Sequence, residues 1–351
     1  MISANGVTLR LGKRALFEDV NIKFTEGNCY GIIGANGAGK STFLKILSGQ
    51  LEPTNGSITM TPGQRLSVLE QDHFKYDDCV VLDTVMMGNA RLFEIMKEKD
   101  AIYAKEDFSD EDGIRASELE AEFAQMNGWE ADSDAASLLN GLGIETDLHY
   151  KKMGELDGPD KVKVLLARAL FGNPDILLMD EPTNHLDISS VQWLEDFLRS
   201  YKGAVFVISH DRYFLDRITN RTFELEHGKL TIYKGNYSTY LKLKAEHNLT
   251  VQRNYDNTKK EIDRIYGIVE QQRRWNRERN IKTAESKLKM IERLENTLEK
   301  PADELETMEF HFDIQKRGGN DVLTVKDISL SYDSKPVFKH VTMDIHRKER
   351  I

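Results

Sequence analysis

The chain has 351 residues, 40% of them hydrophobic, and a formal net charge of −10; this length predicts two structural units and a connector rather than one domain. The acidic balance argues against a protein that coats nucleic acid over its whole surface. Two cysteines without close spacing, Cys29 and Cys79, argue against a disulfide framework or a zinc site and favour a cytoplasmic location. The sequence lacks a secretory signal and any apolar run near the ~18 residues of a membrane helix, so we expect no membrane span.

Strand and helix patterns alternate along the first 240 residues. Residues 5–25 are typical of antiparallel strands with a turn near Gly12. Apolar runs that indicate buried strands occur at 29–33, 176–179 and 204–208. Apolar residues at helical spacing occur at 43–47 and 162–170. The alternation predicts an α/β fold with a largely parallel sheet and an antiparallel β subdomain, which we assign to a first domain over 1–240.

Two charged segments have helical patterns. Residues 90–150 are predicted to form an acidic helical insertion, because 98–134 contains 13 Asp and Glu but 3 Lys and Arg. Between 241 and 300 the balance reverses, with 15 Lys and Arg against 10 Asp and Glu. We interpret 241–305 as a basic linker of two long helices with a turn near Trp275.

An internal repeat indicates a second copy of the first domain. Residues 7–20 align without a gap with 328–341, and three positions are identical: Leu9 with Leu330, Phe17 with Phe338, and Val20 with Val341. We therefore expect residues 306–351 to be the first strands of a second, similar domain, in a longer tandem protein. The alternative is a protein that ends within this fold, which leaves a strand edge unpaired.

A glycine-rich motif predicts a phosphate-binding loop. The sequence fits the P-loop pattern G-x-x-x-x-G-K-[ST] between a strand and a helix, as that motif requires. Its residues are Gly34, Ala35, Asn36, Gly37, Ala38, Gly39, Lys40, Ser41 and Thr42. The backbone N–H groups of such a loop and the helix N-terminus bind phosphate. Lys40 supplies positive charge to the phosphates, and Ser41 supplies a hydroxyl to Mg²⁺.

Acidic residues follow the strand at 176–179, at the edge where parallel sheets bind ligands. Asp180 is suited to hold Mg²⁺ through water, and Glu181 to activate the attacking water as a general base. His210 follows the next predicted strand, where a histidine can reach a phosphate. His210 and Gln71 have little weight alone, because single histidines and surface glutamines are common.

Together these motifs resemble those of the ATP-binding cassette (ABC) ATPases. The run from Glu181 to Asp187, EPTNHLD, is similar to the ABC-F subfamily, cytosolic tandem ATPases that act on ribosomes. The resemblance covers 1–240 closely and extends to the end of the chain. It implies ATP and Mg²⁺ as ligands, Ser41, Gln71 and Asp180 as magnesium ligands partly through water, Glu181 as catalytic base and His210 as switch histidine.

The family signature is degenerate in this sequence. The pattern Leu-Ser-Gly-Gly-Gln/Glu corresponds to Leu156, Asp157, Gly158, Pro159 and Asp160. In the family, the serine and the glycine amides of this signature bind the γ-phosphate that is held by the P-loop of the opposite cassette. Asp157 brings negative charge there and Pro159 has no N–H to donate, so we expect the ATP site that uses this signature to be weakened or rearranged.

The linker holds candidate RNA contacts. Basic residues are concentrated around Trp275, and the candidates are Arg273, Arg274, Arg277, Arg279 and Lys282. Arginines beside an aromatic ring can bind an RNA backbone and stack on bases. A solvated charged hairpin is the alternative, but the resemblance implies that the linker approaches tRNA and rRNA on the ribosome.

The resemblance thus implies an ATPase that acts on the ribosome as a translation factor. A ribosome-protection protein for antibiotic resistance shares the fold, and the motor subunit of a membrane transporter is the alternative of another class. The expected partners are the ribosome and the second ABC domain of the full-length chain, with a homodimer as an option for the chain itself. We expect residues 1–351 to hydrolyse ATP weakly, because the opposing signature is missing.

Overall fold

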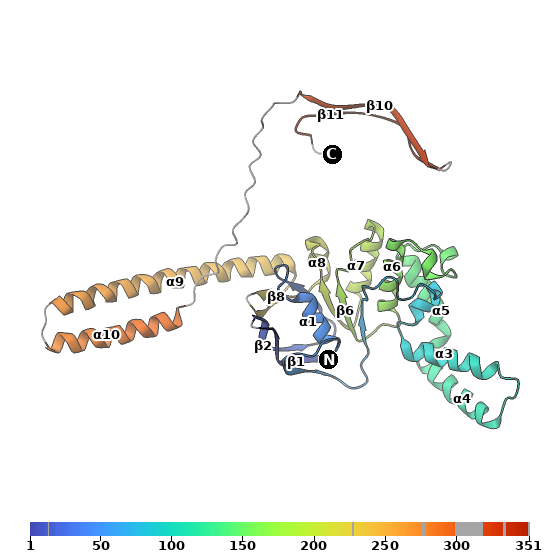
Figure 1. The fold of residues 1–351 in the computed structure, drawn as a ribbon, viewed down its shortest axis with the longest axis horizontal. Coiled ribbons are helices and arrows are strands. Elements are labelled where there is room, and N and C mark those ends of the chain that lie inside the picture. Colours follow the sequence, from blue (N-terminus) through green and yellow to red (C-terminus); the bar gives the residue numbers. More distant parts are fainter. Residues whose placement is uncertain (13, 227, 275–277, 299–318, 333–334, 350–351) are drawn as a thin grey trace. The chain divides into compact units, whose positions relative to one another are not determined.

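The computed structural model describes residues 1–12, 14–226, 228–274, 278–298, 319–332 and 335–349 (Figure 1). The chain divides into two compact units, Met1–Lys300 and Pro301–Ile351.

A six-stranded sheet forms the centre of the first unit, with strand order β5-β6-β7-β3-β8-β9. These strands are β3 (Cys29–Ile33), β5 (Leu66–Val68), β6 (Ile176–Asp180), β7 (Ala204–Ile208), β8 (Arg221–Glu226) and β9 (Lys229–Lys234). All neighbours pair in parallel except β8 and β9, which pair antiparallel. The largely parallel sheet confirms the predicted α/β fold, and it places the carboxyl ends of β3, β6 and β7 at one edge.

A second, antiparallel sheet covers one side of this core. Its order is β2-β1-β4, from β1 (Ile2–Leu11), β2 (Arg14–Phe24) and β4 (Asn55–Met60). Aromatic rings join the two sheets: Phe24 of β2 meets Phe206 of β7 edge to face at 4.5 Å between ring centroids, and Tyr30 of β3 at 5.3 Å. The predicted antiparallel subdomain is therefore present and packs on the parallel sheet through a hydrophobic core that includes α1 (Lys40–Leu47).

Helices build the other hydrophobic core of the first unit. They are α2 (Val81–Met86), α3 (Ala90–Tyr103), α4 (Asp110–Gln125), α5 (Ala131–Gly141), α6 (Gly158–Leu170), α7 (Ile188–Arg199) and α8 (Arg212–Ile218). Alternate residues of β6 and β7 enter the two cores, as expected for strands whose side chains point to opposite faces. The acidic segment contains α3, α4 and α5, so its helical pattern is confirmed.

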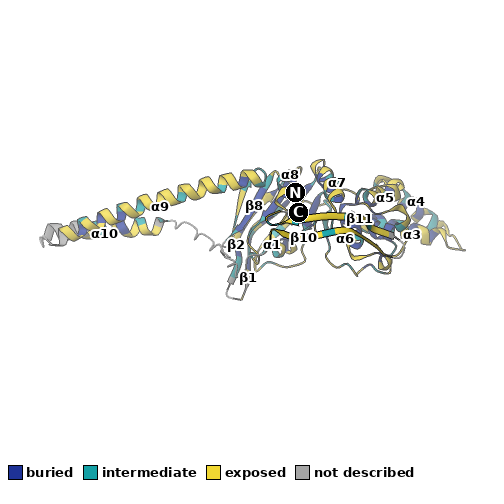
Figure 2. Ribbon diagram, turned by 90° about the horizontal axis from the view of Figure 1, so that it is seen from above, coloured by how far each residue is buried: buried dark blue, intermediate teal, exposed yellow. Residues whose placement is uncertain are grey.

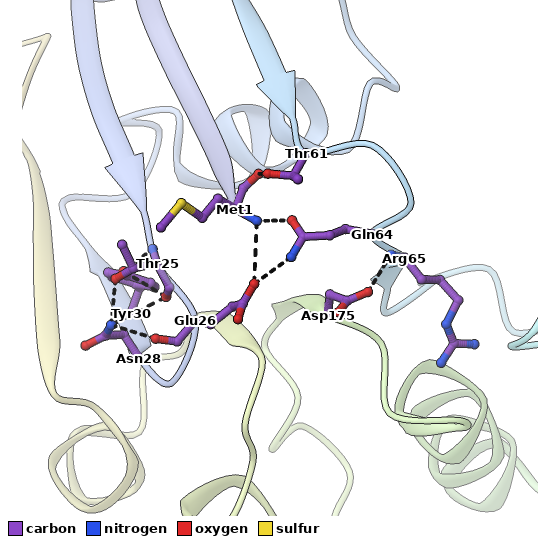
Figure 3. Close-up of polar contacts among 9 residues, drawn as sticks. All are labelled: Met1, Thr25, Glu26, Asn28, Tyr30, Thr61, Gln64, Arg65 and Asp175. Atoms are coloured by element: carbon purple, nitrogen blue, oxygen red, sulfur yellow. Dashed lines mark hydrogen bonds and ion pairs between the residues drawn. The ribbon is translucent and has the colours of Figure 1, made fainter.

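Polar contacts near the start of the chain connect the antiparallel subdomain to the parallel sheet (Figure 3). The side-chain amide of Gln64 donates to Glu26 at 2.7 Å between Nε2 and Oε1. One residue later, the backbone N–H of Arg65 donates to Asp175 Oδ2 at 2.7 Å. The β4–β5 connection is thereby fixed to both the β2–β3 turn and the start of β6.

A pair of long helices follows the sheet. α9 (Tyr237–Arg274) and α10 (Glu278–Thr297) pack together through a small core centred on Ile262, Ile265 and Ile291. Figure 2 shows most of α9 as exposed, apart from its start and the stretch beside α10. No helix among the described residues combines the length and the apolar character that crossing a membrane demands. The predicted turn at Trp275 lies outside the described residues.

The second unit contains one antiparallel pair, β10 (Asp321–Tyr332) and β11 (Lys335–His346), in its described part. This pair repeats the local geometry of β1 and β2. Asp19 and His340 both have a positive φ, and each backbone N–H donates at 2.9 Å to a hydroxyl of the partner strand, on Thr8 and Ser329 respectively. The repeat in the sequence therefore corresponds to a repeat of strand register and irregularities.

Candidate nucleotide-binding site

The P-loop connects β3 to α1. Gly34 passes close to β8, and a Cβ there would lie 2.4 Å from the carbonyl oxygen of Leu225. Gly39 caps α1 with φ of 102°, a conformation that favours glycine. Lys40 Nζ donates to the carbonyls of Gly34 at 2.8 Å and Ala35 at 3.1 Å, so the ammonium group lies within the loop.

The three predicted magnesium ligands come together beside this loop. Ser41, Gln71 and Asp180 line one cavity of about 370 Å³, between the start of α1, the end of β5 and the end of β6. Gln71 Nε2 donates to Asp180 Oδ2 at 3.4 Å. Hydroxyl, amide and carboxylate oxygens are the ligands that Mg²⁺ takes in proteins, so this set fits the metal.

Glu181 and His210 meet at the ends of two neighbouring strands, β6 and β7. The backbone N–H of His210 donates to Glu181 Oε2 at 3.2 Å, and His210 Nε2 lies 3.6 Å from Oε1. Glu181 Oε1 is buried without a hydrogen-bond partner. The Glu181 side chain is 19% exposed and that of His210 is 67% exposed. A buried acceptor without a partner beside an accessible histidine suits a bound water.

The signature residues lead into α6: Leu156 precedes its N-cap, and Gly158, Pro159 and Asp160 lie in its first turn. Asp157 is the N-cap, and its Oδ1 accepts the backbone N–H of Asp160 at 3.0 Å. Pro159 lies in the first turn, where a helix has no intrahelical use for the N–H that proline lacks. Burial, together with Asp157, raises the pKa of Asp160. Asp157 and Pro159, which replace family residues, thus give α6 a well-capped start. This start has few backbone N–H groups free to bind a phosphate.

A cluster that the motifs do not reveal surrounds Glu70, the residue before Gln71. Its carboxylate contacts Tyr76 Oη at 3.1 Å, Lys75 Nζ at 3.2 Å and Arg168 Nη1 at 3.1 Å. Burial alone would raise the pKa of Glu70, but Arg168 and Lys75 outweigh it and lower that pKa. Adjacency to Gln71 was the single sequence signal available for this residue.

The base of α9 is attached to the same sheet. Glu224 of β8 is 7% exposed, accepts from Tyr240 Oη at 2.6 Å and contacts Lys244 Nζ. Burial, together with this hydrogen bond, raises the pKa of Tyr240. Asp216 of α8 accepts the backbone N–H of Ser238 at 2.6 Å. The start of α9 is therefore bound to β8, which passes the P-loop, and to α8, which follows His210.

The predicted RNA contacts lie near the junction of α9 and α10. Arg277 lies outside the described residues, and so do the side chains of Arg273, Arg274, Arg279 and Lys282.

Comparison with known proteins relates the chain to ABC proteins. Residues 17–184 and 223–312 match two family models that are both described as ABC transporter. ABC transporter ATP-binding protein YkpA of Bacillus subtilis is 50% identical over 352 residues, 100% of this chain and 64% of the relative. The energy-dependent translational throttle protein EttA of Mycobacterium tuberculosis is 32% identical, over 96% of this chain and 59% of the relative. The chain thus spans less than two thirds of the length of these relatives.

A solved structure shares the fold. The ATP binding subunit of an ABC transporter is 17% identical and superposes with a TM-score of 0.51, over 67% of this chain and 90% of that chain. At this identity the likeness shows the architecture of the first unit alone.

Proposed function

Since the chain carries an ABC ATPase domain, we propose that the complete protein hydrolyses ATP to ADP and phosphate and acts on the ribosome as an ABC-F translation factor. The observation that carries the ATPase proposal is the buried, unpartnered Glu181 Oε1 beside His210. The ribosomal proposal is supported by the similarity to EttA, a translational throttle protein, and by the basic residues around Trp275.

The P-loop binds the phosphates in this proposal. The loop glycines let backbone N–H groups face the β- and γ-phosphates, and the N-terminus of α1 adds a favourable dipole. Lys40, which bonds to the carbonyls of Gly34 and Ala35, turns its ammonium group to the phosphates. Ser41, Gln71 and Asp180 would hold Mg²⁺, which would supply positive charge next to the phosphates.

Glu181 acts as the general base. Its Oε1 accepts a proton from the attacking water, while its Oε2 is held by the N–H of His210. The backbone bond fixes the carboxylate, so the orientation of the base does not depend on the exposed imidazole. His210 contacts the γ-phosphate and senses its presence.

Hydrolysis requires a partner cassette. In the proposed mechanism the second ABC domain of the full-length chain supplies a signature to the P-loop at 34–42. Residues 1–351 bind ATP but hydrolyse it slowly, and dimerisation between two copies does not restore full activity because Asp157 and Pro159 replace the phosphate-binding signature groups.

The linker contacts tRNA and rRNA through Arg273, Arg274, Arg277, Arg279 and Lys282 in this proposal. Arginine neutralises phosphates and stacks on bases in single-stranded RNA. ATP binding brings the two cassettes together and positions the linker, and hydrolysis releases the protein from the ribosome.

Co-sedimentation with ribosomes tests the proposed function. The complete protein with Glu181→Gln is mixed with ribosomes in ATP or ADP, and Lys40→Ala serves as the control that does not bind nucleotide. We expect binding in ATP that is lost in ADP and in Lys40→Ala. Intact ATP affinity without ribosome binding would contradict the ribosomal part and favour a transporter motor, which the family description also suggests.

A charge-matched comparison tests the linker. Glutamine replaces Arg273, Arg274, Arg277 and Arg279 in one variant, and the exposed residues Lys23, Lys202, Lys229 and Lys234 in the control. We expect the linker variant alone to lose ribosome binding, with unchanged nucleotide affinity. Equal losses in both variants would mean that general charge, and not the linker, governs association.

A further inference from the structure

Ion pairs of Glu70 fix the start of the segment 70–79, which carries Gln71. Glu70 follows Leu69, the first residue after β5. Leu69 is buried, and its backbone N–H donates to the carbonyl oxygen of Leu178 on β6 at 2.9 Å. The Glu70 carboxylate then receives Lys75 and Tyr76 from its own loop and Arg168 from α6. These contacts hold the loop in a folded-back conformation around Glu70. They also attach it to α6, the helix whose first turn contains signature residues.

Arg168 depends on this carboxylate. Its side chain is 17% exposed, its guanidinium lies 4.7 Å from the centre of the Tyr76 ring, and its Nε is buried without a hydrogen-bond partner. A buried charge is costly unless it is paired. Removal of the Glu70 charge therefore favours a shift of Arg168, and of the loop that contacts it, towards water.

A second set of contacts fastens the far end of the loop to the same segment. Lys161 of α6, 8% exposed, contacts Asp77 Oδ1 at 2.6 Å. The backbone N–H of Gly154 donates to Asp77 O, and that of Met153 donates to Cys79 O, both at 2.9 Å. Residues 70–79 are thus held at both ends by residues 153–168.

The side chain of Gln71 has a weak hold of its own, the 3.4 Å contact with Asp180. Its place in the cavity is therefore governed by the backbone of the loop. We propose that Glu70 is a positioning residue that sets Gln71 in the magnesium site and joins this site to α6, so that residues 70–79 and the signature move together. This inference rests on the proposed ATPase function and names residues that link one nucleotide site to the signature used by the other.

Metal dependence of nucleotide binding tests the proposal. Glu70→Gln keeps the shape of the side chain and removes its charge. The control Asp83→Asn breaks the exposed pair Asp83–Lys97, 3.4 Å, on α2 and α3. Binding of a fluorescent ATP analogue to residues 1–351 is measured against Mg²⁺ concentration and in EDTA. We expect Glu70→Gln to raise the half-saturating Mg²⁺ about tenfold, with unchanged affinity in EDTA, and Asp83→Asn to match the parent.

Hydrogen exchange without nucleotide separates this inference from the proposed function. Glu70→Gln is expected to speed exchange of the amides at 71–77 and at the start of α6, while α9 and the parallel sheet keep the exchange of the parent. A parent chain that binds no nucleotide would refute the ATPase proposal but leave this test valid. If Glu70→Gln does not fold, Tyr76→Phe removes one donor to Glu70 and should give a smaller shift of the same sign. A magnesium requirement equal to that of Asp83→Asn, with unchanged exchange at 71–77, overturns the inference.

Discussion

His210 holds the carboxylate of Glu181 with its backbone and not with its ring: the N–H of His210 donates to Oε2 at 3.2 Å, whereas Nε2 stays 3.6 Å from Oε1. The main chain just after β7 thereby orients the proposed base, and the imidazole is left free to contact a phosphate. Glu181 itself has φ of 53°, so the turn after β6 adopts a sparsely populated conformation at this point.

Glu181→Gln is expected to leave ATP binding intact and to slow hydrolysis by about 10²- to 10⁴-fold, the usual contribution of a general base. The amide keeps the acceptor for the His210 N–H but does not take a proton from water. Phosphate release by the complete protein, at saturating ATP and Mg²⁺, measures the effect. Turnover equal to that of the parent would remove Glu181 as the base.

Gly34→Ala is expected to lower the free energy of unfolding by about 1–3 kcal/mol through overpacking, because its Cβ would lie 2.4 Å from Leu225 O. Gly49→Ala is the matched control, since Gly49 also has a positive φ but no atom within 4 Å of a built Cβ. Urea unfolding compares the two. Equal losses would show that backbone strain, and not contact with β8, makes glycine necessary at position 34.

Lys244→Met is expected to destabilise the first unit by about 2 kcal/mol, the range for hydrogen bonds to charged groups, because Glu224 then keeps its buried charge without its cation. Arg264→Met is the control: Arg264 forms an exposed pair with Glu261 on the same helix, and such pairs contribute little. The stability of both variants is measured by denaturant unfolding, monitored through the circular-dichroism signal of the helices. A similar small effect in each would show that the pair at the base of α9 adds nothing beyond a surface contact.

Cys29 is expected to resist thiol reagents at pH 8 in the folded protein. Burial raises the pKa of its thiol to about 12, so the reactive thiolate is scarce. Labelling followed by peptide mass analysis should place any modification of the native chain on Cys79 and modify both cysteines after denaturation. Prompt labelling of Cys29 would mean that β3 opens readily.

Asp112, at the start of α4, is expected to stabilise the acidic helices in a pH-dependent way. Hydrogen bonds from Lys105 and Ser109 lower its pKa from 3.8 to about 2. Since the folded value is the lower one, this stabilisation is complete above pH 3.8 and is lost as the pH falls towards 2. Carboxyl NMR should show a midpoint near 2, and Lys105→Met should move it towards 3.8; an unchanged midpoint in that variant would exclude Lys105 as the cause.

The local parts of the site could be predicted from the sequence. The P-loop residues are consecutive in the chain, and Asp180 directly follows an apolar run. The pattern of apolar residues was therefore enough to place both at the carboxyl edge of a parallel sheet. The contacts Glu70–Arg168 and Glu224–Lys244 could not be foreseen, since each joins two elements whose packing no local pattern specifies. The sequence also marked Pro159 as an anomaly, whereas in the structure it occupies a helix position that tolerates proline.

The attachment of α9 at its base has a geometric consequence. At 1.5 Å per residue, its 38 residues reach about 57 Å, while the contacts to Asp216, Glu224 and Glu226 come from Ser238, Tyr240 and Lys244, near its start. The helix is thus attached at its start to the sheet that carries the P-loop, and most of its length extends from there to Arg274. A tilt of about 5° at the base displaces the far end by about 5 Å for this length. A tilt at the base that is too small to alter the packing of the sheet therefore displaces the far end of α9 by a distance comparable to the size of a nucleotide base.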